Sequence, residues 1–203
     1  MKELNDKIFE NSGDINKILT KKNLSEKKIV FTNGCFDILH KGHIHLLKKA
    51  KSFGDLLIVG LNSDKSIKHL KGNDRPINNL DERLSLLSEI PYIDLLIIFE
   101  EKTPINLIKK IKPKILVKGD DYNINDVVGS AFVKNNGGNI GESIFEKDKL
   151  DDCSEIISLA EQKNVNVLLP EDVVASNKFS NEGLKKVINI YKIPDGWQGL
   201  DIG

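Results

Sequence analysis

The sequence predicts an α/β protein built on a parallel, Rossmann-like sheet that helices flank. Short apolar runs such as 55–61, D-L-L-I-V-G-L, are typical of strands buried on both faces, as parallel sheets require. These runs alternate with amphipathic stretches at a spacing that right-handed βαβ units produce. Polar motifs follow the runs, at the carboxyl ends of the expected strands, where open α/β sheets bind their ligands.

The chain begins with a polar extension, residues 1–28, which is rich in Lys, Asn, Glu and Asp. Its apolar residues, among them Ile8, Phe9 and Ile15, are spaced as one or two short amphipathic helices that would lean on the edge of the sheet. The first strand is expected at 29–32, I-V-F-T, where the apolar run begins.

The next two elements are a helix at 42–52 and a strand at 55–61. Apolar residues of the helix repeat at a spacing that turns one face toward the sheet. Gly54 is expected to close this helix in the left-handed conformation. The strand then ends in the polar triplet 62–64, N-S-D.

Five further elements follow in this domain. A helix is expected at 63–69, and a second at 82–88 with Asn79 or Asp81 as its cap. The strand 94–99 follows, and Thr103-Pro104 opens a helix because proline suits a first helical turn. That helix runs to 111, Pro113 ends it, and a fourth strand is predicted at 115–117.

Composition excludes several classes of protein. Thirty basic and thirty acidic residues cancel, so no overall charge favours nucleic acid or a membrane surface. Cys35 and Cys153 make neither a disulfide framework nor a zinc motif. No run reaches the roughly 18 apolar residues of a membrane span, and the N-terminus has no signal core. A soluble, cytoplasmic protein is expected.

The stretch from Val30 to His45 has the order of a phosphate site: strand, glycine turn, two histidines and helix. A helix N-terminus offers backbone N–H groups and a positive dipole end to an anion. Gly34 is expected to let the chain turn tightly, and Gly42 removes a Cβ where a triphosphate approaches the backbone. His40 and His43 can donate hydrogen bonds to phosphate oxygens.

These residues resemble a known family. His40 to His43, within G-C-F-D-I-L-H-K-G-H, resembles the HxGH signature of the nucleotidyltransferase superfamily. The wider stretch 28–139 resembles its sugar-phosphate branch, above all the adenylyltransferases of ADP-heptose synthesis, with glycerol-3-phosphate cytidylyltransferases as more distant relatives. The motifs that carry the likeness are G-L-N-S-D at 60–64, K-G-N-D-R-P-I at 71–77, D-E-R at 81–83 and V-K-G-D-D-Y at 117–122.

The resemblance implies transfer of AMP from ATP to a sugar 1-phosphate similar to D-glycero-β-D-manno-heptose 1-phosphate, with release of pyrophosphate. Mg²⁺ would accompany the triphosphate, and no metal ligand is expected from the protein. Only the resemblance favours ATP over CTP. The implied catalytic residues are His40, His43, Lys118 and Arg83; the nucleotide-binding residues are Thr32, Asn33, Gly34, Phe36, Gly42 and Gly119; and the acceptor-binding residues are Asp37, Asn62, Asp64 and Arg75.

The family pattern breaks after the turn 135–138, N-N-G-G. The expected last strand and the S-T-T segment that opens a final helix are not recognisable in the sequence. Residues 140–203 instead resemble an internal piece of phosphoglycerate kinase, most clearly in I-P-D-G-W-Q-G-L-D-I-G. The predicted domains are therefore an extension at 1–28, a nucleotidyltransferase domain at 29–139 and a kinase-like fragment at 140–203.

Three readings stay open at this point. The chain is either an active transferase or a nucleotide-binding chimera that lacks a closing helix. A phosphoglycerate kinase remnant with residual nucleotide affinity is the third reading. A homodimer is consistent with the resemblance, since relatives often dimerise.

Overall fold

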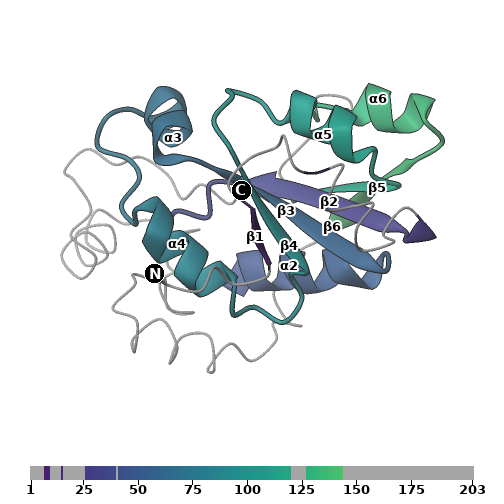
Figure 1. Ribbon diagram of the computed structural model, residues 1–203, viewed down its shortest axis with the longest axis horizontal. Coiled ribbons are helices and arrows are strands. Elements are labelled where there is room, and N and C mark those ends of the chain that lie inside the picture. The colour runs from purple at the N-terminus through teal and green to yellow at the C-terminus, as the bar shows by residue number, and fades with distance from the viewer. Residues whose placement is uncertain (1–6, 10–14, 16–25, 40, 120–126, 144–203) are drawn as a thin grey trace, which may run out of the picture.

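The computed structural model describes residues 7–9, 15, 26–39, 41–119 and 127–143. Within these ranges, six strands form one parallel sheet in the order β1-β4-β3-β2-β5-β6 (Figure 1). The strands are β1 (Ile8–Phe9), β2 (Ile29–Gly34), β3 (Leu56–Asn62), β4 (Leu95–Phe99), β5 (Ile115–Gly119) and β6 (Asn139–Ser143). The helices are α2 (Lys41–Ser52), α3 (Asp64–Lys71), α4 (Leu80–Leu87), α5 (Ile105–Ile111) and α6 (Ser130–Asn135). The predicted Rossmann-like fold is confirmed.

Strand β2 lies at the centre and sets the register of the site. It pairs with β3 from Ile29 opposite Leu56 to Gly34 opposite Leu61, and with β5 on its other side. All six of its residues are buried, which matches the apolar run in the sequence. Because the strands are parallel, the ends of β2, β3 and β5 meet at one edge of the sheet.

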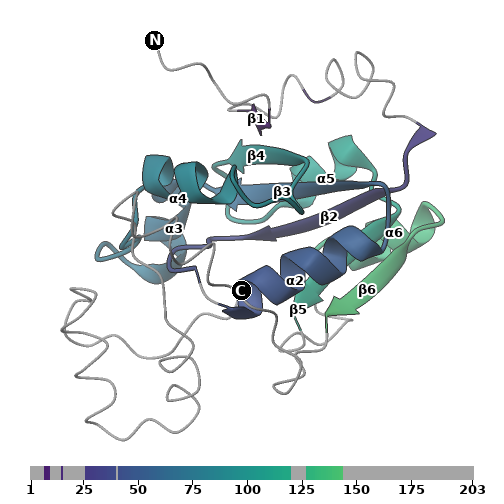
Figure 2. The same cartoon turned by 90° about the horizontal axis from the view of Figure 1, so that it is seen from below.

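Helices cover both faces of the sheet, with α5 and α6 above the strands and α2 below them in Figure 1. Alternate strand residues therefore enter two separate cores. On the α2 side, Val30 packs in one cluster with Leu47. On the α5 side, Phe31 packs in another with Ile108. Figure 2, turned by 90°, shows α2 lying along one face of the sheet.

The edges of the sheet differ from the sequence prediction. Ile8 and Phe9 were expected in a helix but form β1, which pairs with Leu96 and Ile97 of β4. No strand was expected at residues 139–143, yet β6 pairs with the whole of β5, from Ile115 opposite Asn139 to Gly119 opposite Ser143. Both corrections have one cause, since pairing with an existing strand decides the conformation of a short segment whose own pattern is weak.

Gly54 is also corrected. The described glycines with positive φ are Gly72, Gly129 and Gly137, so the expectation of a left-handed Gly54 is wrong. A Cβ at Gly54 would instead collide with the carbonyl oxygen of Lys28 and lie 2.7 Å from Val30 Cγ2. A glycine is needed here because the Lys28 carbonyl approaches the backbone of residue 54 so closely. Asp55 N–H donates a hydrogen bond to the same carbonyl at 2.9 Å.

Two further findings concern helices. Asn79 caps α4 in a capping box with Glu82, which decides between the two caps that the sequence allowed. Among the described residues, no helix has the length and apolar character needed to cross a membrane.

Replacing Gly54 with alanine tests the close approach. We expect Gly54→Ala to lower the free energy of unfolding by about 3 kcal/mol, because backbone cannot yield to the new methyl group as a flexible side chain can. Gly137→Ala is the matched control: its φ is +70° but nothing lies within 4 Å of a Cβ there. It should cost about 1 kcal/mol. Equal losses in urea unfolding would contradict the steric explanation.

Candidate functional site

The carboxyl edge of the sheet gathers most of the residues that the sequence singled out. Asn33 and Gly34 end β2, Asn62 ends β3, and Lys118 and Gly119 end β5. Gly42 and His43 lie in the first turn of α2, beside the same edge. His40 lies outside the described residues, so its placement stays a prediction.

The turn between β2 and α2 has an unusual backbone. Gly34 remains part of the strand, and Phe36 takes the left-handed conformation with φ 46°. The tight turn expected at Gly34 therefore occurs two residues later. A Cβ on Gly34 would lie 3.1 Å from Phe36 Cε2, so this glycine makes room for the aromatic ring. A bulky residue with positive φ is strained and persists only where its surroundings hold it.

Phe36 contacts His43 directly. The centroids of the two rings are 5.0 Å apart and the ring planes are tilted by 57°. Both side chains are buried, with 5% and 3% of their surface exposed. The imidazole therefore has a packing partner in the preceding turn that restricts its orientation.

Asp37 ties this turn to the loop before α4. Its carboxylate accepts hydrogen bonds from the N–H groups of Ile77 (2.7 Å) and Asn78 (3.1 Å), and it forms an ion pair with Arg75 at 2.7 Å. Asn78 Nδ2 donates to the carbonyl of Asp37 at 2.6 Å. Asp37 and Arg75, predicted to bind the acceptor, are thus both brought to the site but are buried and paired with each other.

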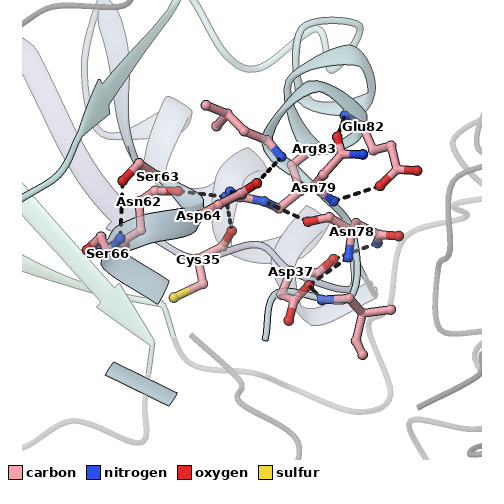
Figure 3. Close-up of polar contacts among 12 residues, drawn as sticks. Cys35, Asp37, Asn62, Ser63, Asp64, Ser66, Asn78, Asn79, Glu82 and Arg83 are labelled. Carbon is pink, nitrogen blue, oxygen red and sulfur yellow. Dashed lines mark hydrogen bonds and ion pairs between the residues drawn. The ribbon is translucent and has the colours of Figure 1, made fainter. Parts of the chain in front are cut away.

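Arg83 is the most connected side chain at this edge (Figure 3). Its Nη1 donates to the carbonyls of Cys35 (2.9 Å) and Asn62 (2.8 Å), and its Nε donates to the carbonyl of Asn78 (3.1 Å). Its Nη2 forms an ion pair with Asp64 Oδ1 at 2.6 Å. The residue is 2% exposed. Four of the five guanidinium N–H groups thus have protein acceptors.

The end of β3 is occupied by a polar network of its own. Asn62 Nδ2 donates to Ser66 Oγ at 3.0 Å, and Ser66 Oγ donates to the carbonyl of Glu101 at 3.1 Å. Ser63 caps α3 by accepting from Ser66 N. Asp64 Oδ2 accepts from Leu80 N at 3.2 Å. Asn62 and Asp64, predicted to bind the acceptor, hold neighbouring segments together here.

The ends of β2 and β5 are joined by a lysine. Lys118 Nζ donates to the carbonyl of Asn33 at 3.0 Å. Among the described residues, neither Thr32 Oγ1 nor Asn33 Oδ1 has a hydrogen-bond partner, although both atoms are buried. Because buried polar atoms normally have partners, these two are candidates for contact with a ligand.

Lys71 is a residue that the prediction missed. Its Nζ has almost no access to solvent and interacts with the Cys35 thiol, near Arg75 and Asp37. Burial lowers the pKa of the Lys71 ammonium, and Arg75 lowers it further, whereas Cys35 and Asp37 oppose the shift. The signal was present in the motif K-G-N-D-R-P, in which only Arg75 was selected.

Cys35 is a free, buried cysteine. Burial raises the pKa of its thiol, and this effect is larger than the lowering of the pKa by the nearby positive charges of Lys71 and Arg83. The neutral thiol is a poor nucleophile. No group of three or more His, Cys, Asp or Glu side chains is placed to hold a metal ion in the part of the chain that the structure describes.

This arrangement can bind and polarise an anion. Helix α2 carries no acidic residue in its first turn, so its N-terminal amides and dipole present a positive field at the edge. His43, Lys71 and Lys118 add donors or positive charge near the same strand ends. The described residues at this edge include no activated nucleophile, and their arrangement is suited to stabilising phosphate charge.

Comparison with known proteins agrees with this chemistry. The sequence profile of the family described as Cytidylyltransferase-like matches residues 31–134, and that of Phosphoglycerate kinase matches residues 102–203. Bifunctional protein HldE from Campylobacter concisus (strain 13826) is 56% identical over 121 residues, which are 60% of this chain and 25% of that protein. The chain spans about a quarter of the length of the curated relatives it matches.

Two solved structures can be compared with this chain. The lipopolysaccharide core biosynthesis protein from Thermoplasma volcanium GSS1 is 30% identical, with a TM-score of 0.49 over 62% of this chain and 99% of that one. Pantoate-beta-alanine ligase from Francisella tularensis is 21% identical, with a TM-score of 0.52 over 91% of this chain and 85% of that one, which is a likeness of fold alone. Through residues 31–134 the chain belongs to the cytidylyltransferase-like family, and through residues 102–203 it also belongs to the phosphoglycerate kinase family.

Proposed function

We propose that the chain transfers AMP from ATP to a sugar 1-phosphate, of the D-glycero-β-D-manno-heptose 1-phosphate kind, and releases pyrophosphate. The observation that supports this most is the N-terminus of α2, which opens at the carboxyl edge with His43 held in its first turn. The choice of ATP and of a heptose phosphate rests on the resemblance of motifs 60–64, 71–77 and 117–122 to that branch of the family.

In this reaction the protein mainly has to align the two substrates and stabilise phosphate charge. An oxygen of the acceptor phosphate attacks the α-phosphorus of ATP in line, and the bond from that phosphorus to the leaving pyrophosphate breaks. The acceptor phosphate is itself the nucleophile, so no side chain has to form a covalent bond to the nucleotide. His43 and the α2 amides would stabilise negative charge on the phosphate oxygens, and His40 would share this role.

Lysines are the side chains best placed to neutralise further charge. Lys118 reaches the end of β2, and Lys71 lies beside the turn at Cys35. Asp37 and Asp64 are each paired with an arginine, so these carboxylates do not suit a protein-held Mg²⁺ site. A Mg²⁺ ion would enter with the triphosphate, whose charge it would partly neutralise.

A second candidate function comes from the phosphoglycerate kinase match to residues 102–203. It predicts that the chain transfers a phosphoryl group between a phosphoglycerate and a nucleotide, and that it transfers no nucleotidyl group. A nucleotide-binding chimera without turnover is the remaining alternative. These readings differ in their products, so one set of assays separates them.

Pyrophosphate release tests the proposed function. Purified protein with Mg²⁺ is given ATP or CTP together with heptose 1-phosphate, glycerol 3-phosphate or no acceptor. We expect pyrophosphate with ATP and the heptose phosphate and a stoichiometric ADP-sugar product. ATP binding without pyrophosphate would favour the chimera, and ATP formed from ADP and 1,3-bisphosphoglycerate would favour the kinase remnant.

Substitution of His43 tests the role of the helix terminus. His43→Ala should lower kcat about a hundredfold or more, since removal of one well-placed donor costs about 2.7 to 4 kcal/mol in the barrier. His45→Ala is the matched control, because His45 lies on the same helix and is only half-buried. Equal activities of the two variants, both folded by circular dichroism, would refute the assignment.

The pH dependence of ATP binding tests Lys71. Because the pKa of this ammonium is lowered, it loses its proton at a lower pH than an ordinary lysine, and positive charge at the site falls as pH rises through that pKa. The affinity for ATP, measured by calorimetry from pH 7 to 10, should therefore weaken with rising pH in the wild type. Lys71→Arg keeps its charge throughout and should give a flatter profile. Identical profiles would show that Lys71 does not contact the phosphates.

A further inference from the structure

We propose that Arg83 is a positioning residue that holds the peptide between Cys35 and Phe36 and, through the Phe36 ring, sets the orientation of His43. This inference rests on the proposed function and deepens it. It replaces the expectation that Arg83 is itself a catalytic residue. The steps of the linkage are contacts between described residues.

The first step is the reach of the guanidinium. One side chain joins the turn after β2, the end of β3, the start of α3 and the loop before α4, at Cys35, Asn62, Asp64 and Asn78 respectively. Three of these partners are backbone carbonyls, and the fourth, Asp64, is the first residue of α3, so together they define one position for the group. Only a planar fork with several fixed N–H directions can serve such divergent acceptors.

The second step is the strain at Phe36. Its positive φ is unfavourable for a residue with a Cβ, and neighbouring contacts hold it from both sides. On the amino side, Arg83 Nη1 binds the carbonyl of Cys35 at 2.9 Å. On the carboxyl side, Asp37 is bound through its carboxylate to Ile77 N and through its carbonyl to Asn78 Nδ2. Without Arg83, the Cys35–Phe36 peptide loses its partner.

The third step links the conformation of Phe36 to the orientation of His43. The Phe36 ring lies 5.0 Å from the His43 ring, and both are buried, so a rotated Phe36 backbone cannot leave the imidazole where it is. Arg83 itself is 2% exposed, with four N–H groups engaged by protein. It therefore acts on the phosphates through His43 rather than by contact.

A kinetic double-mutant cycle tests the linkage. Arg83→Lys keeps the charge but not the fork, and should lower kcat about a hundredfold, as misplacement of a catalytic group by about 1 Å does. In the His43→Ala background the same change should lower kcat by less than about threefold, because the group that it positions is gone. Equal, multiplicative losses in both backgrounds would overturn the proposal and support direct contact with phosphate.

A nuclear magnetic resonance measurement gives a second readout that needs no turnover. The ring protons of His43 should carry a ring-current shift from Phe36, and Arg83→Lys should move these resonances toward the values of an unstacked imidazole. Lys51→Met is the matched control: Lys51 is also a bridging cation, held by Asp55 O at 2.8 Å and Asp94 Oδ2 at 2.6 Å at the opposite edge of the sheet. It should lower the midpoint of thermal unfolding and leave the His43 signals unchanged.

The outcomes separate this inference from the proposed function. If the wild type releases no pyrophosphate, the proposed function fails, and the His43 signals alone decide the inference. If the Arg83→Lys variant does not fold, the Asp64→Asn variant takes its place. This substitution weakens the ion pair between Asp64 and Arg83 Nη2 and leaves Arg83 itself unchanged. A smaller shift of the His43 signals in the same direction would support the linkage. Unchanged His43 signals in the folded variant, Arg83→Lys or Asp64→Asn, would overturn it.

Discussion

The buried network between the turn after β2 and the loop before α4 is the constraint on which the rest of the site depends. Asp37 and Arg83 carry opposite charges into the interior, where each is stabilised by hydrogen bonds to backbone groups and by one ion pair, with Arg75 and Asp64 respectively. The turn in return keeps a conformation at Phe36 that it would not keep alone. Two stretches about 40 residues apart in sequence thus fix each other.

The interior of the fold could be predicted because its signals are local. An apolar run such as 56–62 cannot be solvated, so it becomes a strand with both faces covered, whatever follows it. The start of α5 after Pro104 and the cap at Asn79 depend on neighbouring residues only. The positions of site residues followed from the same rule, since parallel strands end at one edge, and the sequence placed Asn62 and Lys118 directly at such ends.

The roles of those residues could not be predicted, because they depend on distant partners. A charged side chain after a loop is normally solvated, and no local pattern shows that Arg83 meets carbonyls 48 and 21 residues earlier in the chain. Gly54 was expected to serve a helix end, yet it is required by the carbonyl of Lys28. Strand β1 is two residues long and is defined by its pairing with β4.

Strand β6 shows how the two family matches meet in one structure. Both profiles include residues 102–134, and within the described part of this stretch β5 pairs with β2 in the sheet. The segment 139–143, N-I-G-E-S, contains little apolar surface, but β5 offers it a full row of backbone partners. Gly141 also fits closely there, since a Cβ would lie 3.1 Å from both Ile115 and Phe53. A division of the chain at residue 140 therefore cuts a strand that is built into the sheet beneath the candidate site.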